Sequence, residues 1–334
     1  VAQMVEADLE KVNEIYAEVF AKSEVDLNGD RDPGVRNMET NLSNLITDAY
    51  LYMAREYVKK EGMDLTVDMA VVNGGGTRAG IPAGEISRNH IFTVLPNRTT
   101  VVLMTVTGAQ LLEALEASTF CTPMALGGFP QVAGMEYTLN TAIPYESGDQ
   151  YPESTYYAPA KPGSRVTIRS INGKPFDLNG DYTIAVDSFQ AQGGDTYYIL
   201  TKASFVHDTG IVAGDALISY INSMDHVIGE EYASPKGRVE IIEEAAGAAE
   251  TVIPETEENA VKQETDEALS AEEKEASVEV ITNLYKVVAG DSLWRIAQKE
   301  LGAGSRWGEI YGANKAQIKN PGMIYIGQEL IVNK

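Results

Sequence analysis

Three arginines stand beside turns or glycine-rich segments, where loop side chains are often gathered into binding sites. Arg31 and Arg36 flank the sequence Asp-Pro-Gly-Val, and Arg78 follows three glycines and a threonine. A guanidinium group is planar and can bind two oxygens of one phosphate at once. These arginines therefore predict recognition of a phosphate group, although a solvated surface charge explains Arg31 equally well.

A second pair of residues has the chemistry to hold a nucleoside. Phe189 offers a flat ring on which a base can stack, a contact worth roughly 1–3 kcal/mol in single-stranded nucleic acid systems. Asp195 follows Gly193 and Gly194 and could accept hydrogen bonds from two ribose hydroxyls. Each has a plainer explanation, because Phe189 alone suits a core position and Asp195 a turn. Taken with the arginines, the pair indicates a site for a nucleoside phosphate.

Four short stretches resemble motifs of a known family. They are Arg31 to Arg36 leading into Glu39-Thr40-Asn41-Leu42-Ser43-Asn44-Leu45, then Val72-Asn73-Gly74-Gly75-Gly76-Thr77-Arg78, Gln131-Val132-Ala133-Gly134-Met135, and Phe189-Gln190-Ala191-Gln192-Gly193-Gly194-Asp195. Their order and spacing over roughly residues 28 to 240 are similar to the C-terminal domain of the 5′-nucleotidase family, which includes UDP-sugar hydrolases and 2′,3′-cyclic nucleotide phosphodiesterases. Each motif alone is a weak signal, but the four together are specific.

The resemblance implies roles for individual residues. Arg36 and Arg78 would contact the phosphate or ribose, Asn73 would reach the base region, and Phe189 would form one face of an aromatic sandwich around the base. The implied substrate-binding set is Arg31, Arg36, Asn73, Arg78, Gly134, Phe189 and Asp195. In the family the second face of the sandwich is the phenylalanine of a Pro-Phe-Gly sequence. Here Asn97 stands in its place, so we expect weaker or altered base recognition.

The family's hydrolysis uses a pair of divalent metal ions held by Asp-x-His and Gly-Asn-His-Glu/Asp motifs of a separate N-terminal domain. This chain has three histidines, His90, His207 and His226, and none has that ligand spacing. We therefore expect no metal site, cofactor or catalytic residue in this chain, a metal pair in an N-terminal domain outside it, and no phosphatase activity from the chain alone.

The end of the chain resembles a LysM repeat. The resemblance rests on Tyr285 to Ala297 and on Asn320 to Val332, and it implies a small βααβ module that binds N-acetylglucosamine glycans such as peptidoglycan. The implied glycan-binding residues lie on two loops and are Gly290, Asp291, Ser292, Leu293, Pro321 and Ile324. The large aromatic side chains of the module, including Trp294, are equally well explained as core.

Periodicity predicts how the chain is organised. Apolar residues at helical spacing predict helices over Val1 to Lys22, Asn41 to Tyr57 and Ala213 to Met224. Short β-branched runs predict strands over Thr66 to Val72, Thr99 to Val106, Arg165 to Ile171 and Tyr182 to Val186. Interleaved helices and strands favour an α/β (α+β) layered domain with a mixed sheet. We divide the chain into a hinge or linker helix (1–27), a substrate-binding domain (28–242), a flexible acidic linker (243–282) and the LysM module (283–334).

Composition narrows the possible partners. The net charge is −23, and residues 243 to 279 hold 13 acidic and two basic side chains, which favours an extended linker. An acidic body argues against nucleic acid binding. One cysteine excludes an intrachain disulfide, and no apolar run is long enough to span a membrane. The chain starts at Val1, which suggests a fragment or processed product.

Two functional hypotheses follow. In the first, the chain is the substrate-specificity domain of a bacterial extracellular 5′-nucleotidase, held at the cell wall by LysM. In the second, it is a non-catalytic, wall-anchored binding or adhesion protein whose nucleotidase-like domain is degenerate at Asn97.

Overall fold

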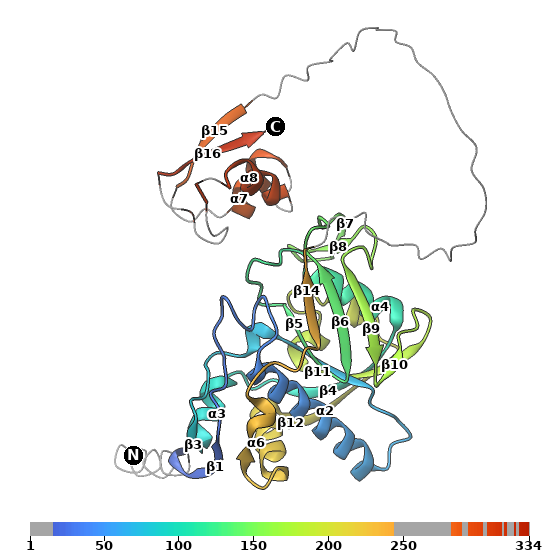
Figure 1. The fold of residues 1–334 in the computed structure, drawn as a ribbon. Coiled ribbons are helices and arrows are strands. Elements are labelled where there is room, and N and C mark those ends of the chain that lie inside the picture. Colours follow the sequence, from blue (N-terminus) through green and yellow to red (C-terminus); the bar gives the residue numbers. More distant parts are fainter. Residues whose placement is uncertain are drawn as a thin grey trace, which may run out of the picture. The chain divides into compact units, whose positions relative to one another are not determined.

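The computed structural model of the chain describes residues 16–243, 282–288, 293–302, 306–315, 317–318, 324 and 327–333. They form two compact units that divide after Glu244, a body and a small C-terminal module (Figure 1). The predicted linker lies outside the described residues except at its ends, as do residues 1–15 of the first predicted helix. No helix in the described part of the chain is both long and apolar enough to cross a membrane.

The body is a mixed α/β fold, as predicted. Its strands are β1 (Val19–Ser23), β2 (Met69–Asn73), β3 (Gly84–Ser87), β4 (Thr100–Thr107), β5 (Pro130–Ala133), β6 (Met135–Asn140), β7 (Ser147–Gln150), β8 (Tyr157–Pro159), β9 (Val166–Ile171), β10 (Lys174–Pro175), β11 (Asp181–Asp187), β12 (Phe205–Val212), β13 (Val227–Ile228) and β14 (Val239–Ile242). Its helices are α2 (Asn41–Glu61), α3 (Arg88–Val94), α4 (Gly108–Ser118), α5 (Ser188–Ala191) and α6 (Ala213–Ser223), with 3-10 turns η1 (Gly74–Gly76), η2 (Tyr198–Lys202) and η3 (Glu230–Tyr232).

A five-stranded sheet in the order β12-β4-β11-β2-β5 runs through the body. β11 and β2 are parallel, whereas β12–β4, β4–β11 and β2–β5 are antiparallel pairs. Around it lie a four-stranded sheet in the order β10-β9-β6-β14, a three-stranded sheet β13-β1-β3 and the β7-β8 hairpin.

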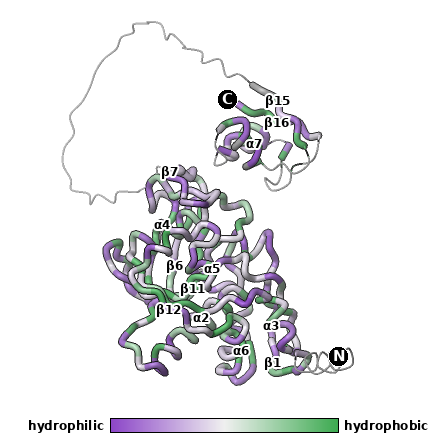
Figure 2. Tube along the Cα trace, turned by 180° about the vertical axis from the view of Figure 1, so that it is seen from behind, coloured by the Kyte–Doolittle hydropathy of each residue, from purple (hydrophilic) through white to green (hydrophobic). Residues whose placement is uncertain are grey.

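The five-stranded sheet separates two hydrophobic cores. In β2, Ala70 and Val72 belong to one core, and Met69 and Val71 belong to the other, because successive side chains of a strand point to opposite faces. α2, α3 and α6 cover the first face, while α4 and strands β6 and β9 cover the second (Figure 1). Figure 2 shows the hydrophobic residues concentrated along β11, inside this body. A sheet buried on both faces gives its strand ends a rigid base.

Most predicted elements agree with the structure in type. The predicted second helix continues to Glu61, where Gly62 ends it in a left-handed conformation (φ 63°). A capping box begins α4, where Thr107 and Gln110 form both reciprocal hydrogen bonds between side chain and backbone N–H.

The first predicted helix is wrong at its C-terminal end. Val19–Ser23 forms strand β1, which pairs with β3 and β13, and Leu27 forms an isolated bridge with Ile81. These residues are therefore part of the body, not of a separate hinge. Pairing with two distant strands outweighs the helical apolar stripe, because tertiary contacts override local propensity.

The C-terminal module has the predicted βααβ order. Strands β15 (Thr282–Lys286) and β16 (Glu329–Asn333) pair antiparallel, and α7 (Leu293–Glu300) and α8 (Trp307–Ala313) lie between them in sequence. Asn314 is buried and links α8 to β16, since its amide donates to the carbonyls of Ile310 and Ile331 and accepts from the Ile331 N–H.

Gly74 offers a direct test of how tightly the body's loops are packed. A Cβ at Gly74 would lie 1.7 Å from the carbonyl oxygen of Val35, whereas a Cβ at Gly76 would meet only the Asn73 side chain at 3.6 Å. We expect Gly74→Ala to lower the free energy of unfolding by about 1–3 kcal/mol or more, because backbone must move to relieve the overlap. Gly76→Ala is the matched control. Equal urea midpoints for the two variants would contradict this packing.

Candidate functional site

The candidate site lies at one edge of the five-stranded sheet. The parallel strands β2 and β11 end there at Asn73 and Asp187, and the antiparallel strands β4 and β5 begin there, after Thr99 and Gly127. In open α/β sheets, ligands commonly bind outside the carboxyl ends of the strands. Side chains from segments far apart in the sequence therefore meet at a single edge.

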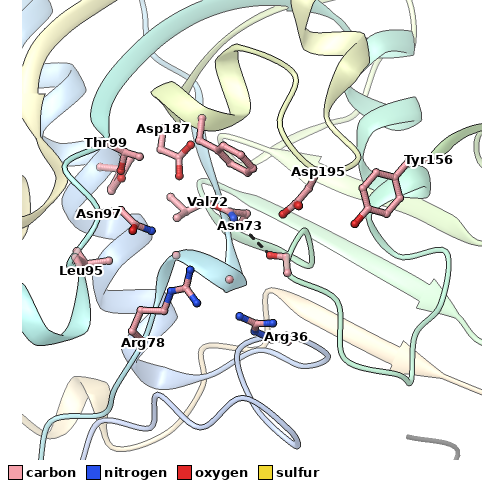
Figure 3. A pocket seen from close by; sticks show the side chains of 15 residues that line it. Arg36, Val72, Asn73, Arg78, Leu95, Asn97, Thr99, Tyr156, Asp187 and Asp195 are labelled. Carbon is pink, nitrogen blue, oxygen red and sulfur yellow. Dashed lines mark hydrogen bonds between the residues drawn. The ribbon is translucent and has the colours of Figure 1, made fainter. Parts of the chain in front are cut away.

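A cavity of about 550 Å³ opens at this edge (Figure 3). This volume suits a small organic ligand of nucleotide size. Its lining residues are Arg36, Tyr50, Val72, Asn73, Gly75, Gly76, Arg78, Leu95, Asn97, Thr99, Gly127, Tyr156, Asp187, Phe189 and Asp195.

Hydrogen bonds to its backbone carbonyls hold the loop that carries Arg36. The buried side-chain amide of Gln131 donates to the carbonyls of Val35 (3.0 Å) and Met38 (2.7 Å). The Leu126 N–H donates to the Arg36 carbonyl (2.9 Å). Gln131 comes from the third sequence motif, so that motif supports the arginine loop. The position of the Arg36 guanidinium therefore depends on strand β5 and on the loop that leads into it.

The consecutive glycines after β2 have a structural role. The Gly74 N–H donates to the Phe129 carbonyl (2.8 Å) and the Gly75 N–H donates to the Gly127 carbonyl (2.7 Å). These N–H groups are used within the protein, so the turn differs from a phosphate-binding loop, where such groups point at the ligand. The close packing lets the chain turn directly from β2 to Arg78, whose N–H donates to the Val94 carbonyl (2.8 Å).

The charges around Arg36 favour the binding of an anion. Burial, followed by the like charges of Arg31 and Arg78, lowers the pKa of Arg36, while the carboxylate of Asp195 acts in the opposite direction. The Arg36 Nε is buried and has no hydrogen-bond partner among the residues that the structure describes. A buried, unpaired donor is costly, and an anion bound here would pair with it and offset the repulsion between the guanidinium groups.

Asp195 lines the cavity and interacts electrostatically with Arg36 and Arg78. It has a left-handed backbone conformation (φ 51°), which aspartate tolerates better than most residues. Burial raises its pKa, whereas Arg36, the Asn73 side chain and Arg78 lower it. The half-buried carboxylate can accept hydrogen bonds from ligand hydroxyl groups.

The apolar wall of the cavity includes a highly exposed aromatic ring. Phe189 is 43% exposed, so it is not the core residue that its type alone would suggest. The ring lies over Gly194, where an added Cβ would come within 2.5 Å of it. The absence of a side chain at Gly194 therefore leaves room for the ring of Phe189 on one face, and the other face of the ring is available for stacking.

The cavity contains a second acid that the sequence analysis missed. Asp187 is 4% exposed and begins α5, where its Oδ1 accepts from the Gln190 N–H (2.7 Å). Burial raises its pKa from 3.8 to about 6; backbone N–H donors of Gln190 and Phe189 counteract this, and the charge of Asp195 adds to it.

The structure brings five of the seven predicted residues to this cavity: Arg36, Asn73, Arg78, Phe189 and Asp195. That they bind a nucleotide stays a prediction. Arg31 is exposed and does not line the cavity, although its charge influences Arg36. Gly134 does not line it either, because it lies between β5 and β6 in a left-handed conformation (φ 72°) packed against Asp68, Leu51 and Met69. The glycine that does line the cavity near Asp195 is Gly127.

Sequence reasoning also missed Tyr50, Thr99 and Tyr156. Tyr156 precedes strand β8 and lies beside Asp195 at one end of the cavity (Figure 3). Its ring packs edge-on against Phe120 (6.1 Å between centroids). The region around it has no clear periodicity, so only the fold could reveal it. Asn97, which replaces the family phenylalanine, does line the cavity, and its side chain is exposed.

Most of the predicted glycan-binding residues lie outside the described part of the module, namely Gly290, Asp291, Ser292 and Pro321. Leu293 is 1% exposed and belongs to the module's core, so its side chain is not available to a glycan. Ile324 packs partly against the same core. The Trp294 side chain lies outside the described residues.

Among the residues that the structure describes, no group of three or more His, Cys, Asp and Glu side chains could hold a metal ion. His90 instead accepts from the Ser87 N–H at the start of α3 (3.0 Å), and the His207 ring contacts the Tyr57 hydroxyl (2.9 Å). The described residues therefore do not fit a metal pair.

Comparison with known proteins assigns both parts of the chain to families. The family model for the 5′-nucleotidase C-terminal domain matches residues 19–202, and the model for the LysM domain matches residues 285–333. The chain thus belongs to the 5′-nucleotidase C-terminal domain family and carries a LysM domain. The match begins at β1, in agreement with its place in the body.

Individual relatives match part of this chain. The trifunctional nucleotide phosphoesterase YfkN of Bacillus subtilis is 35% identical over 60% of this chain, and the protein UshA of Escherichia coli is 31% identical over 64%. A solved structure, the 5′-nucleotidase precursor of Thermus thermophilus, covers 73% of the chain at 30% identity with a TM-score of 0.57. This chain spans 12% of YfkN, 32% of UshA and 43% of the Thermus chain.

The raised pKa of Asp187 predicts how stability depends on pH. The folded state holds a proton that the unfolded state releases between about pH 4 and 6, so the wild-type protein loses stability as pH rises through this window. Asp187→Asn removes the buried charge, and asparagine caps a helix as well as aspartate does. At pH 8 we expect this variant to have a higher free energy of unfolding, by at most about 3 kcal/mol.

The difference should disappear near pH 4, where the wild-type carboxyl is protonated in both states. Urea titrations at pH 4, 6 and 8 measure it. A variant that is less stable than the wild type at pH 8, or a difference that does not change with pH, would contradict this placement of the carboxyl group.

Proposed function

We propose that the body binds nucleoside phosphates in the cavity at the edge of the five-stranded sheet, as the substrate-recognition domain of a 5′-nucleotidase-type phosphoesterase. The observation that carries the proposal is the convergence of two guanidinium groups, a half-buried carboxylate and an exposed phenyl ring on one cavity. A phosphate, a ribose and a base need these three kinds of contact.

The arrangement assigns a part of the ligand to each group. Arg36 and Arg78 bind the phosphate, because charge-assisted hydrogen bonds to guanidinium are strong and bidentate. Asp195, next to Arg36 and Asn73, accepts from the ribose hydroxyls. The base stacks on the free face of Phe189. The relatives named above include a nucleotide phosphoesterase and a 5′-nucleotidase, which supports this class of ligand.

In this proposal the chain binds and orients the nucleotide, and a pair of divalent metal ions in an N-terminal metallophosphoesterase domain supplies the hydrolytic step. Fixing the nucleoside lowers the entropic cost of presenting the phosphate for attack. The residues described here contribute no catalytic group to that step.

We also propose that the LysM domain holds the protein at a bacterial cell wall by binding peptidoglycan or a related N-acetylglucosamine glycan. A single small module binds weakly, so it would act as a tether that keeps the nucleotide site near the wall. An extracellular location follows from this role.

Calorimetry with AMP and adenosine tests the nucleotide site. Arg36→Ala and Arg78→Ala should each weaken AMP binding roughly 10- to 100-fold, because each removes a charge-assisted hydrogen bond. Adenosine has no phosphate, and its affinity should change less than about threefold. Arg98→Ala is the matched control, since Arg98 is exposed and does not line the cavity.

Two results would count against the proposal. One is a failure of the wild-type chain to bind AMP at millimolar concentration, which would favour the non-catalytic binding protein suggested by Asn97. The other is an equal loss of AMP and adenosine affinity in the arginine variants.

Sedimentation with insoluble peptidoglycan tests the tether. The full chain should sediment with the glycan, whereas a chain ending at residue 243 should stay in solution and retain its affinity for AMP. Sedimentation of both proteins to the same extent would refute the role of the LysM domain.

A further inference from the structure

The two ends of the cavity differ in charge. Arg36 and Arg78 form the cationic end, and in the view of Figure 3 Asp187 and Thr99 lie beyond Val72 on the other side of the cavity, with Asn97 between Thr99 and Arg78. A nucleotide bound by its phosphate at the arginines and by its base at Phe189 therefore has polar groups near its base as well as near its phosphate.

The carboxylate of Asp187 can accept hydrogen bonds from a ligand. An ionised carboxylate offers about four acceptor positions. The Asp187 carboxylate accepts from the Gln190 N–H and from the Phe189 N–H, and it also lines the cavity. Capacity to accept further hydrogen bonds therefore remains on a carboxylate that is directed into the site.

The helix cap alone does not explain an acid at this position. Asparagine caps a helix equally well and carries no charge. A buried carboxylate is costly, and its desolvation is the main reason that the pKa of Asp187 is raised. Titratable groups held in costly environments within a cavity are often functional.

The replacement of an aromatic residue by Asn97 also leads us to expect hydrogen bonds to the edge of the base. Asn97 cannot stack as an aromatic ring does, so Phe189 forms the stacking contact on one face of the base. Hydrogen bonds at the base edge can supply the missing specificity, because a site that pairs with a polar edge discriminates strongly against a base that lacks the matching group. Asp187 lies two residues before Phe189 and is therefore close to a base stacked on that ring.

We infer that the Asp187 carboxylate, together with the Asn97 amide, recognises the hydrogen-bonding edge of the base and favours bases with an exocyclic amino group. This inference rests on the proposed nucleotide site. Adenine and cytosine present amino donors at N6 and N4. Hypoxanthine and uracil present a carbonyl oxygen there instead, which would face the carboxylate as a second acceptor.

Calorimetry of the full chain at pH 8, where the Asp187 carboxyl is ionised, compares AMP with IMP and CMP with UMP. We expect the wild type to bind the amino-bearing member of each pair at least about tenfold more tightly. Asp187→Asn keeps the helix cap but can both donate and accept, so the preference in each pair should fall below about threefold. Binding of ribose 5-phosphate, which has no base, should not change.

Asp181→Asn is the matched control, because Asp181 is an exposed acid at the opposite end of the same strand, β11. It should leave both preferences unchanged. Equal binding of AMP and IMP by the wild type, or an unchanged preference in Asp187→Asn, would overturn the inference while leaving the nucleotide site intact. If none of the nucleotides binds, the proposed function and this inference both fail.

Discussion

The cavity depends on a set of buried polar groups that the protein itself only partly satisfies. Arg36 is partly buried near two other arginines, and in the described part of the chain neither its Nε nor the Asn73 Oδ1 has a hydrogen-bond partner. Asp187 and Asp195 lie in the same cavity with raised pKa values. Such an arrangement destabilises the fold without a ligand, and a ligand with an anionic end and a donor-rich remainder would satisfy both kinds of group.

The rest of the body positions these groups. Burial of the five-stranded sheet on both faces fixes the ends of β2 and β11, from which Asn73 and Asp187 extend. The arginine loop is held from a different element, through the Gln131 amide and the close approach of Gly74 to Val35. The arginine loop and the strand ends that carry the acidic side chains are thus held by different contacts. A substitution in one of them can leave the position of the other unchanged.

The sequence predicted the chemical groups of the site better than it predicted the full set of residues that line the cavity. Arg78, Phe189 and Asp195 lie in motifs that follow strands β2 and β11, Arg36 lies in a loop before α2, and the fold brings these segments together. Gly134 was predicted from its motif, but the residue of that motif that supports the site is Gln131, whose role depends on a loop about 95 residues away. Asp187 resembled the end of a strand, and Tyr156 lay in a stretch without periodicity. Their places in the cavity depend on tertiary contacts that no local pattern records.

The most direct measurement is a crystal structure of the chain grown with AMP. We expect the phosphate within hydrogen-bond distance of the Arg36 and Arg78 guanidinium groups, the ribose hydroxyls on Asp195 and the base against Phe189. A nucleotide bound in an ordered position elsewhere on the body, without contact to these four residues, would contradict the central claim.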